Sequence, residues 1–386
     1  MHRPVPHHRV DGPPQAPPLI LGPSLGTSLA VWEPHLPALT RRHRVVRWDL
    51  PGHGGSPASL LPAEGATVAD LGRLVLDLAD ALGVDRFAYA GISLGGAVGS
   101  WLAVHHPERI DALALICSSA RFGDPSGWRE RAALVRREGT EQLAASARER
   151  WFTPGFAGGA ALVEDQRAAD PAGYAACCDA LAAFDLRAEL HRIGAPTLVV
   201  AGRQDRATPP VHARELADGI PGATLVELPG AAHLAGVEQP EQVTAALLGH
   251  LRAGGGAGEG TAVRRAVLGD AHVDRATAAT TAFTAPFQEF ITRYAWGEIW
   301  TRPGLDRRTR SCVTLTALVA GGHHEELAMH VRAALRNGLT PEEIGEVLLQ
   351  CAVYCGVPAA NAAFAVANRV LTETTTTGTG TAGKES

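Results

Sequence analysis

Short apolar runs alternate with longer segments of helical periodicity along most of the chain. Aliphatic and β-branched residues dominate these runs, as they do in strands that are buried on both faces. The candidate strands are Val45–Trp48, Phe87–Ala90, Ala112–Cys117, Thr197–Ala201 and Thr224–Glu227. The candidate helices are Val68–Leu82, Leu94–His105, Val211–Asp218 and Gln242–Leu251. This alternation predicts an α/β fold whose mostly parallel sheet is covered by helices on both faces.

Two changes in this pattern divide the chain further. Between residues 120 and 192 the alternation gives way to helical segments that carry aromatic side chains, which predicts a helical lid above the sheet. The later segment AGGGAGEG has the composition of a flexible linker, and only helical patterns follow it. We therefore expect an α/β domain at 1–252, a glycine-rich linker at 253–261 and an all-helical domain at 262–373. The low-complexity residues 374–386 predict a disordered tail.

Composition narrows the range of partners and compartments. The 386 residues carry a formal net charge of −5, so nothing indicates binding to nucleic acid or to an anionic membrane. No apolar stretch is long enough for a secretion signal or a membrane span. The six cysteines lack the spacing of a zinc site, and we interpret them as small core residues. These features predict a cytoplasmic protein.

The segment AGISLGGA, residues 90–97, contains the pattern G-x-S-x-G. A candidate strand precedes Ser93 and a candidate helix follows it. In that context the serine occupies a strained turn that holds its hydroxyl above the edge of the sheet. Glycine is needed on both sides because a side chain there would collide with the neighbouring strand and helix. A purely structural turn also fits the five residues, but their context favours Ser93 as a nucleophile.

A serine nucleophile needs a base, and the base needs an acid that orients it. In folds with this motif the three groups follow the chain order Ser, Asp or Glu, His. Asp205 lies at the end of the candidate strand in TLVVAGRQD, and His233 lies in a loop after the next strand. Ligands bind at these carboxyl ends of strands in open α/β sheets. We therefore predict a triad of Ser93, Asp205 and His233.

Acyl transfer also requires two backbone donors for the oxyanion. The N–H of Leu94 follows the nucleophile at the start of a helix, and Leu25 lies in the loop LILGPSLGTS after an early strand. We predict these two N–H groups as the oxyanion hole. The glycine-rich turn WDLPGHGGS shapes the rim of the pocket, and we interpret His53 within it as structural.

Together these segments resemble the α/β-hydrolase superfamily, and within it the 3-oxoadipate enol-lactonases, over about residues 8–252. The resemblance is carried by GPSLGTSLAVWEPH, RWDLPGHGGS, GISLGG, AGRQDRATPP and GAAHL. One departure is Pro23-Ser24, where relatives commonly have Asn-Ser or His-Gly. Proline has no N–H, but the expected donor is Leu25, so we expect the oxyanion hole to survive.

The helical region contains HHEELAMH, residues 323–330. The zinc motif H-E-x-x-H would need a histidine at position 328, which is alanine, so a metal site is disfavoured. Helical spacing places Glu326 and His330 on one face. That face suits an acid/base pair or a substrate contact, and a solvated helical surface or a metal site stays an alternative.

This region resembles the 4-carboxymuconolactone decarboxylases, within the alkylhydroperoxidase-D-like helical superfamily. The segments that carry the resemblance are VLGDAHVDRA, EFITRYAWGEIWTRPGLDRRTRS, HVRAALRNGLTPEEIGEVLLQ and YCGVPAANAAF. Redox members of that superfamily use a CxxC pair, whereas three residues separate Cys351 from Cys355 here. The spacing argues against peroxide chemistry, although a redox protein that uses these two thiols stays a weaker alternative.

The resemblance implies a decarboxylation without metal or cofactor, because the conjugated lactone itself accepts the electrons that CO2 leaves behind. The protein must hold two carboxylates and deliver one proton. The bidentate guanidinium group suits the first task. The candidates for it are Arg302, Arg307, Arg308 and Arg310. We expect His330 to donate the proton, with Glu298 as its acid/base partner or as a substrate contact.

The product of such a decarboxylase is the substrate of an enol-lactonase. The two resemblances therefore imply a bifunctional enzyme of protocatechuate breakdown, acting on small lactone carboxylates. In the lid, Arg131 and Arg136 are candidates for binding the free carboxylate of the lactone, and Trp128 is a further candidate for substrate binding. The alternative is a general carboxylesterase whose helical appendage only oligomerises the chain. In either case the resemblance implies self-association through the helical domain.

Overall fold

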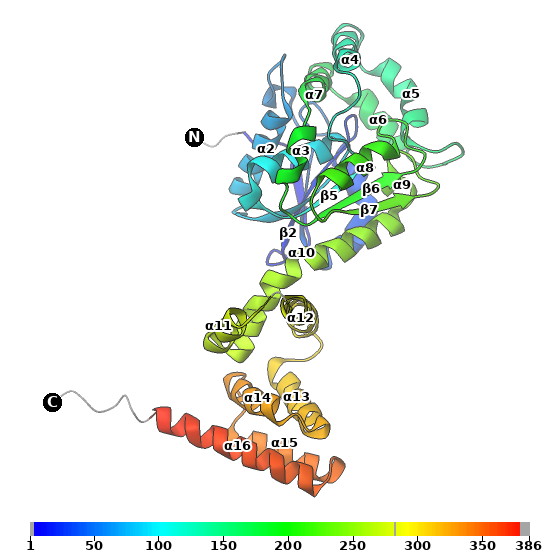
Figure 1. Cartoon of the computed structure of the whole chain (residues 1–386). Helices are drawn as coiled ribbons and strands as arrows, with labels where there is room; N and C mark the ends of the chain where they lie inside the picture. Colours follow the sequence, from blue (N-terminus) through cyan, green and yellow to red (C-terminus); the bar gives the residue numbers. More distant parts are fainter. Residues whose placement is uncertain (1–3, 282, 379–386) are drawn as a thin grey trace, which may run out of the picture. The chain divides into compact units, whose positions relative to one another are not determined.

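The computed structural model describes residues 4–281 and 283–378 (Figure 1). Contacts between residues divide the chain into two compact units, with the division between Gly255 and Gly256. The first unit is built on a sheet and the second is helical. The predicted α/β architecture of the first part and the predicted all-α region are therefore confirmed.

A seven-stranded sheet forms the centre of the first unit. Its strands are β1 (His8–Asp11), β2 (Pro18–Gly22), β3 (Arg44–Trp48), β4 (Phe87–Ile92), β5 (Ile110–Ile116), β6 (Thr197–Gly202) and β7 (Thr224–Leu228). Their order is β1-β3-β2-β4-β5-β6-β7. Only β1 is antiparallel to its neighbour, and every other pair in the described sheet is parallel. The carboxyl ends of six strands therefore meet at one edge.

Each central strand is buried on both faces because alternate residues enter different cores. In β5, Leu113 and Leu115 join one cluster, while Ala112, Ala114 and Ile116 join the other. The first cluster includes apolar residues of α2 (Val68–Ala81) and α3 (Leu94–His105). The second includes residues of η1 (Leu29–His35) and the first half of α10 (Pro240–Leu268). These two layers hold the ends of the strands in place.

Helices between β5 and β6 form the predicted lid, and Figure 1 shows them gathered at one end of the first unit. They are α4 (Pro125–Glu138), α5 (Glu141–Trp151), α6 (Ala160–Ala168) and α7 (Pro171–Ala183). The remaining elements of this unit are α1 (Leu36–Leu39), η2 (Ala58–Leu60), η3 (Pro107–Arg109), η4 (Arg187–Arg192), α8 (Pro210–Gly219) and α9 (Ala235–Glu238).

The second unit contains the end of α10 and further helices, with no strand among its described residues. These helices are α11 (Asp270–Ala278), α12 (Ala285–Ile291), the π-helix η5 (Thr292–Ile299), α13 (Arg307–Gly321), α14 (His324–Arg336), α15 (Pro341–Tyr354) and α16 (Val357–Gly378). Asp306 caps α13 and Thr340 caps α15, each with its side chain accepting a backbone N–H. One apolar cluster joins α13 to α16, and a smaller one surrounds Trp296.

Two predictions of flexible or disordered segments differ from the structure. The glycine-rich segment 253–261, predicted as a flexible linker, lies within the continuous helix α10. Glycine lowers helix propensity by only about 1 kcal/mol per residue, so the surrounding helix can extend through it. Of the predicted disordered tail, residues 374–378 belong to α16, and 379–386 lie outside the described residues. Within the described part of the chain, no helix has the length and hydrophobicity that crossing a bilayer requires.

Candidate functional site

Ser93 occupies a tight turn between β4 and α3. Its backbone has φ 54° and ψ −114°, in a region that non-glycine residues rarely enter. The turn is held by its neighbours, because the Ser93 N–H donates to the carbonyl of Ile116 at 2.9 Å. The Ser118 hydroxyl donates to the carbonyl of Ser93 at 2.8 Å. Backbone strain maintained in this way is typical of functional positions.

The glycines beside Ser93 are required by close backbone contacts. A Cβ atom on Gly91 would lie 2.2 Å from the carbonyl carbon and oxygen of Gly95. A Cβ atom on Gly95 would lie 2.4 Å from the carbonyl oxygen of Gly22 in β2. Both distances are too short for non-bonded atoms, which is the reason expected from the sequence. The turn therefore places α3 directly against β2 and β4.

Asp205 and His233 meet at the carboxyl ends of β6 and β7. The Nδ1 atom of His233 lies 2.9 Å from Oδ2 of Asp205, and both side chains are buried. The other carboxylate oxygen of Asp205 accepts the N–H groups of Ala207 at 2.8 Å and Thr208 at 2.9 Å. The Thr208 hydroxyl donates to Oδ2 at 2.7 Å. These hydrogen bonds hold the Asp205 carboxylate in place independently of its contact with His233.

The charge state of Asp205 follows from these contacts. Burial raises the pKa of this carboxyl, but the opposite charge and hydrogen bond of His233, with the hydrogen bonds from Thr208, outweigh burial. The net result is a pKa below the usual value, so the group is a carboxylate at neutral pH. A buried carboxylate can orient the imidazole and stabilise its protonated form.

Leu25 and Leu94, the predicted oxyanion donors, belong to the loop after β2 and to the start of α3. Leu25 lines the same cavity as Ser93, and Leu94 begins the helix directly after it. The N–H of the following residue, Gly26, donates to Nε2 of His53 at 3.1 Å. The Nδ1 atom of His53 lies 3.0 Å from the carbonyl of Pro51. Burial lowers the pKa of His53, which keeps the imidazole neutral and able to accept at Nε2.

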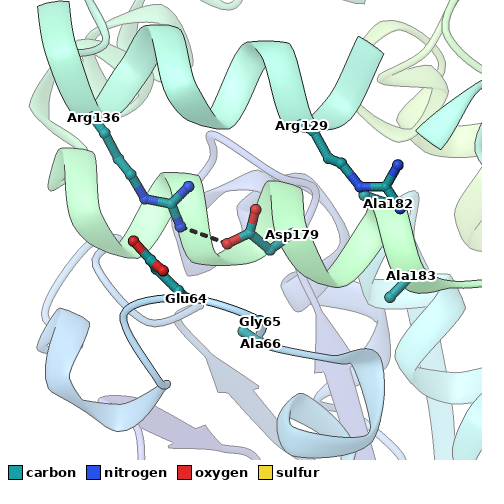
Figure 2. Close-up of a pocket in the computed structure, with 8 residues that line it drawn as sticks. All are labelled: Glu64, Gly65, Ala66, Arg129, Arg136, Asp179, Ala182 and Ala183. Atoms are coloured by element: carbon teal, nitrogen blue, oxygen red, sulfur yellow. Dashed lines mark hydrogen bonds and ion pairs between the residues drawn. The ribbon is translucent and has the colours of Figure 1, made fainter. Parts of the chain in front are cut away.

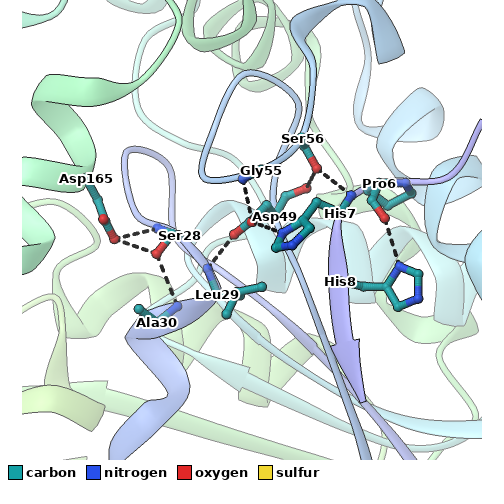
Figure 3. Close-up of polar contacts among 10 residues, drawn as sticks. All are labelled: Pro6, His7, His8, Ser28, Leu29, Ala30, Asp49, Gly55, Ser56 and Asp165. Atoms are coloured by element: carbon teal, nitrogen blue, oxygen red, sulfur yellow. Dashed lines mark hydrogen bonds and ion pairs between the residues drawn. The ribbon is translucent and has the colours of Figure 1, made fainter.

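A buried carboxylate anchors the far side of this loop (Figure 3). Asp49 accepts the N–H of Leu29 at 2.6 Å and the N–H of Gly55 at 2.9 Å. The Nδ1 atom of His7 lies 2.7 Å from its Oδ2. From the lid, Asp165 accepts both the N–H and the hydroxyl of Ser28, at 3.1 and 2.6 Å. The oxyanion loop is therefore tied to β3 on one side and to lid helix α6 on the other.

A cavity of about 270 Å³ brings these groups together. It is lined by Ser24, Leu25, Ser93, Phe122, Trp128, Arg131, Arg150, Trp151, Gln166, Tyr174, Arg206, Ala207, Thr208 and His233. Two of the predicted lid residues, Trp128 and Arg131, line the cavity. The Arg131 guanidinium lies 4.6 Å over the ring of Trp128. The cavity is thus bounded by the strand ends below and the lid above.

Arg136 differs from the prediction. It lines a separate cavity with Glu64 and Arg129, where it forms an ion pair with Asp179 (Figure 2). The residue lies five positions after Arg131 in α4, so the helix turns its side chain away from the position that Arg131 takes. Arg136 is therefore not a lining residue of the Ser93 cavity.

Sequence reasoning missed several polar residues of the Ser93 cavity, among them two arginines and a glutamine. Arg150 and Arg206 line it, and so does Gln166, which is fully buried. The Gln166 amide nitrogen lies 3.4 Å from the Tyr174 hydroxyl, while its Oε1 has no hydrogen-bond partner among the described residues. A single sequence contains no local signal for these residues, because the lid folds them onto the strand ends from a distance.

In the second unit His330 packs on α14 beside Trp296. The two rings are stacked with their centroids 6.5 Å apart. The pKa of His330 is lowered to about 4, mainly by burial and also by His272, while Glu326 opposes the shift. His330 is therefore neutral at neutral pH, and its electrostatic neighbours are His272 and Glu326. The expected pairing of Glu326 with His330 on one face is consistent with this arrangement.

The other predicted residues of this unit lie elsewhere. Glu298 belongs to η5 and is not among the groups that shift the pKa of His330. Arg308 donates to the carbonyl of Gly338 and forms an ion pair with Glu343. Arg310 donates to the carbonyls of Leu305 and Arg302, at 3.2 and 2.8 Å.

Arg302 and Arg307 are exposed. None of the four predicted arginines is among the residues that line the cavity beside α11 and α14, which His272 lines. Arg310 instead holds the loop before α13, and Arg308 holds the loop between α14 and α15.

Comparisons with known proteins divide the chain at the same place as its fold. The family model of the alpha/beta hydrolase fold matches residues 17–240. The model of the carboxymuconolactone decarboxylase family matches residues 285–369. The two matches do not overlap, so each unit has its own relatives.

Individual relatives agree with the family models. The chain is 38% identical over 230 residues to 3-oxoadipate enol-lactonase 2 of Acinetobacter baylyi, covering 58% of this chain and 85% of the relative. It is 49% identical over 112 residues to 4-carboxymuconolactone decarboxylase of the same organism, covering 29% of this chain and 84% of the relative. The crystal structure of the enol-lactonase from Burkholderia xenovorans superposes with a TM-score of 0.61 at 38% identity, covering 64% of this chain and 95% of that one.

Proposed function

Because the chain belongs to the α/β-hydrolase family and, through its second unit, to the carboxymuconolactone decarboxylase family, we propose that it is a bifunctional enzyme with two consecutive activities. The second unit decarboxylates 4-carboxymuconolactone to 3-oxoadipate enol-lactone. The first unit hydrolyses that lactone to 3-oxoadipate, in the protocatechuate branch of aromatic breakdown. One observation carries the proposal: the two units resemble enzymes of which one makes the substrate of the other.

Hydrolysis begins with the Ser93 hydroxyl. Its Oγ attacks the lactone carbonyl carbon while His233 removes the proton, and Asp205 stabilises the imidazolium that forms. The N–H groups of Leu94 and Leu25 donate to the oxyanion of the tetrahedral intermediate. The contact between His233 and Asp205, and the position of Ser93 and Leu25 in one cavity, support these roles.

Ring opening then releases an enolate, which His233 protonates as the acyl–oxygen bond breaks. The resulting enol becomes the ketone of the product, and the acyl group stays on Ser93. Water attacks this ester with His233 again as the base, which frees 3-oxoadipate and restores the serine. The Arg131 guanidinium, which lines the cavity, binds the free carboxylate of the lactone.

Decarboxylation needs neither a metal nor a cofactor. The carbon–carboxylate bond breaks, CO2 leaves, and the electron pair spreads through the conjugated ring to the lactone carbonyl oxygen. A proton then adds to the ring carbon next to that carbonyl, which gives the enol-lactone. His330 is the proposed donor, and Glu326 supports this role because its charge raises the pKa of His330, against the effects of burial and His272.

Incubating the purified full chain with 4-carboxymuconolactone tests both activities in one experiment. The expected products are CO2 and 3-oxoadipate, identified by mass spectrometry or nuclear magnetic resonance. In the Ser93→Ala variant we expect CO2 release to continue and the enol-lactone to accumulate. If the wild-type chain releases no CO2 but cleaves neutral esters, it is instead a general carboxylesterase with a helical appendage.

Self-association through the second unit is part of the proposal. Val353, Tyr354 and Val357 lie at the junction of α15 and α16 and are 76%, 78% and 70% exposed. Large apolar side chains that are exposed together are typical of interfaces, and the expected partner is a second copy of the chain. Sedimentation should show an oligomer that Tyr354→Glu weakens. A monomeric wild-type chain would contradict this part of the proposal. A cytoplasmic location stays a prediction.

A further inference from the structure

A further cavity, of about 760 Å³, lies between α11, α14 and the end of α10 in the second unit. Four arginines line it, from two segments that are distant in sequence: Arg265, Arg275, Arg332 and Arg336. His272 lines it as well, and Asp270 contributes the one carboxylate among the lining residues. The lining is therefore strongly cationic, although the chain as a whole has a net charge of −5.

Two of these charges are balanced by neighbouring acids. Arg265 pairs with Asp270 at 3.1 Å and with Asp274 at 2.6 Å, and Arg332 pairs with Glu373 at 2.7 Å. Arg336 instead donates to the carbonyl of Val267 at 3.2 Å. Among the described residues, neither Arg336 nor Arg275 forms an ion pair. Their positive charges are thus available to a ligand.

A fifth arginine, Arg264, does not line the cavity but adds to the positive charge that acts on His272. Arg264 is 8% exposed and donates to the side-chain oxygens of Gln288 at 3.1 Å and Thr292 at 3.2 Å, both neutral. Its buried Nε has no hydrogen-bond partner in the described part of the chain. A buried cation without an acid nearby is costly, and an anion bound close to it would lower that cost.

The cavity connects electrostatically to the proposed proton donor. Burial lowers the pKa of His272, and the charges of Arg264, Arg275 and Arg336 lower it further. His272 in turn lowers the pKa of His330, so the protonation of the two histidines is coupled electrostatically. A bound anion would offset the guanidinium charges and raise both histidine pKa values toward those of useful proton donors.

We propose that this cavity is the binding site for a lactone dicarboxylate, with Arg275 and Arg336 holding its carboxylates and the ring placed beside His272. A guanidinium group binds a carboxylate through two parallel hydrogen bonds, and two guanidinium groups match a substrate with two carboxylates. The site takes the role that the sequence suggested for Arg302, Arg307, Arg308 and Arg310. The proposal rests on the decarboxylase activity proposed above for the identity of the substrate, but not for the existence of the anion site.

Steady-state kinetics of the full chain test the assignment. Arg275→Met and Arg336→Met should each raise the KM for 4-carboxymuconolactone roughly 10- to 100-fold, as expected for losing a charge-assisted hydrogen bond. Arg369→Met, an exposed arginine of α16, is the matched control and should leave KM unchanged. Hydrolysis of enol-lactone by the same samples reports that the first unit is intact. KM values within twofold of wild type in both cavity variants would overturn the proposal.

Binding of succinate provides a second measurement that does not depend on turnover. This dicarboxylate should inhibit CO2 release competitively and raise the melting temperature of the wild-type second unit, and both effects should weaken in the two variants. Arg336→Lys keeps the charge and should bind succinate between wild type and Arg336→Met, which covers the case of a methionine variant that does not fold.

The two proposals can fail separately. Stabilisation by succinate that the arginine variants lose, in a chain that releases no CO2, would keep the anion site and reject the decarboxylase. Release of CO2 without any effect of succinate, or with equal effects in all variants, would reject the anion site.

Discussion

The imidazole Nδ1 of His233 lies 2.9 Å from Oδ2 of Asp205, and both side chains are nearly inaccessible to solvent. The two residues come from loops after adjacent parallel strands, β6 and β7. Each strand ends at the same edge of the sheet, so the contact is a consequence of topology. In the proposed mechanism, the second ring nitrogen of His233 acts as the base in the cavity that Ser93 and His233 both line.

Replacing the acid should abolish most of the hydrolysis while preserving the fold. In Asp205→Asn the amide can no longer stabilise the imidazolium, and we expect kcat for enol-lactone to fall roughly a thousandfold or more. The matched control is Asp179→Asn, whose carboxylate pairs with Arg136 outside the Ser93 cavity. An Asp205→Asn enzyme with kcat within tenfold of wild type would exclude the proposed triad.

Charge recognition in the Ser93 cavity can be tested at Arg131. Arg131→Met should raise the KM for the anionic enol-lactone roughly 10- to 100-fold and leave the hydrolysis of a neutral ester such as p-nitrophenyl acetate nearly unchanged. Arg137→Met removes an exposed arginine of the same helix, paired with Glu138, and serves as the control. Equal losses on both substrates would mean that Arg131 supports the lid and does not bind the carboxylate.

His53 should act by positioning the oxyanion loop. His53→Phe keeps a ring beside Tyr174 but leaves the buried N–H of Gly26 without its acceptor, at a cost of about 1–3 kcal/mol in the free energy of unfolding. We expect kcat to fall about tenfold with little change in KM, because the neighbouring Leu25 donor acts on the transition state.

His53→Gln provides the comparison, since its side-chain oxygen can still accept. It should recover much of the lost kcat. Identical kinetics for the two variants would show that the hydrogen bond has no role in positioning.

The glycine after the nucleophile should tolerate no side chain. In Gly95→Ala the new Cβ would meet backbone oxygens of Gly22 and Pro23 at 2.4 and 2.8 Å, so β2 and α3 must separate. We expect about 1–3 kcal/mol of lost stability and loss of hydrolysis. Gly249→Ala, a helical position with nothing within 4 Å, should instead stabilise the protein slightly. Denaturant unfolding of both variants distinguishes the cases.

Acid should destabilise the first unit through His35. Burial lowers its pKa from 6.5 to about 4, so the unfolded chain binds a proton in this range that the folded chain does not. Stability should therefore fall by about 3 kcal/mol as the pH drops from 6.5 to 4, with no contribution from this residue above 6.5.

His35→Asn removes the titrating group and can retain the contact with Thr244. Its unfolding free energy should depend less on pH over that interval. His105→Asn, an exposed histidine at the end of α3, is the control and should keep the wild-type slope. A slope unchanged by His35→Asn would show that another group dominates the acid response.

Some positions could be predicted because local patterns determine them. The buried strands are continuous apolar runs, and α3 begins and ends at the predicted residues, Leu94 and His105. Strand β1 was missed, since its four residues are mostly polar and lie at an edge of the sheet. The run through 253–261 was misjudged because glycine content is a weak preference that a surrounding helix overrides.

The sequence by itself determined the turn at Ser93, the chain order of the proposed triad and the division into an α/β and a helical part. These features depend on residues that are close in the chain, or on the rule that parallel strands end at one edge. The tertiary structure alone decided that Arg131 and not Arg136 enters the Ser93 cavity, and that Arg275 and Arg336 share a cavity with His272. Helix rotation and the packing of distant segments set which arginine faces a site, and neither leaves a local mark in a chain rich in arginine.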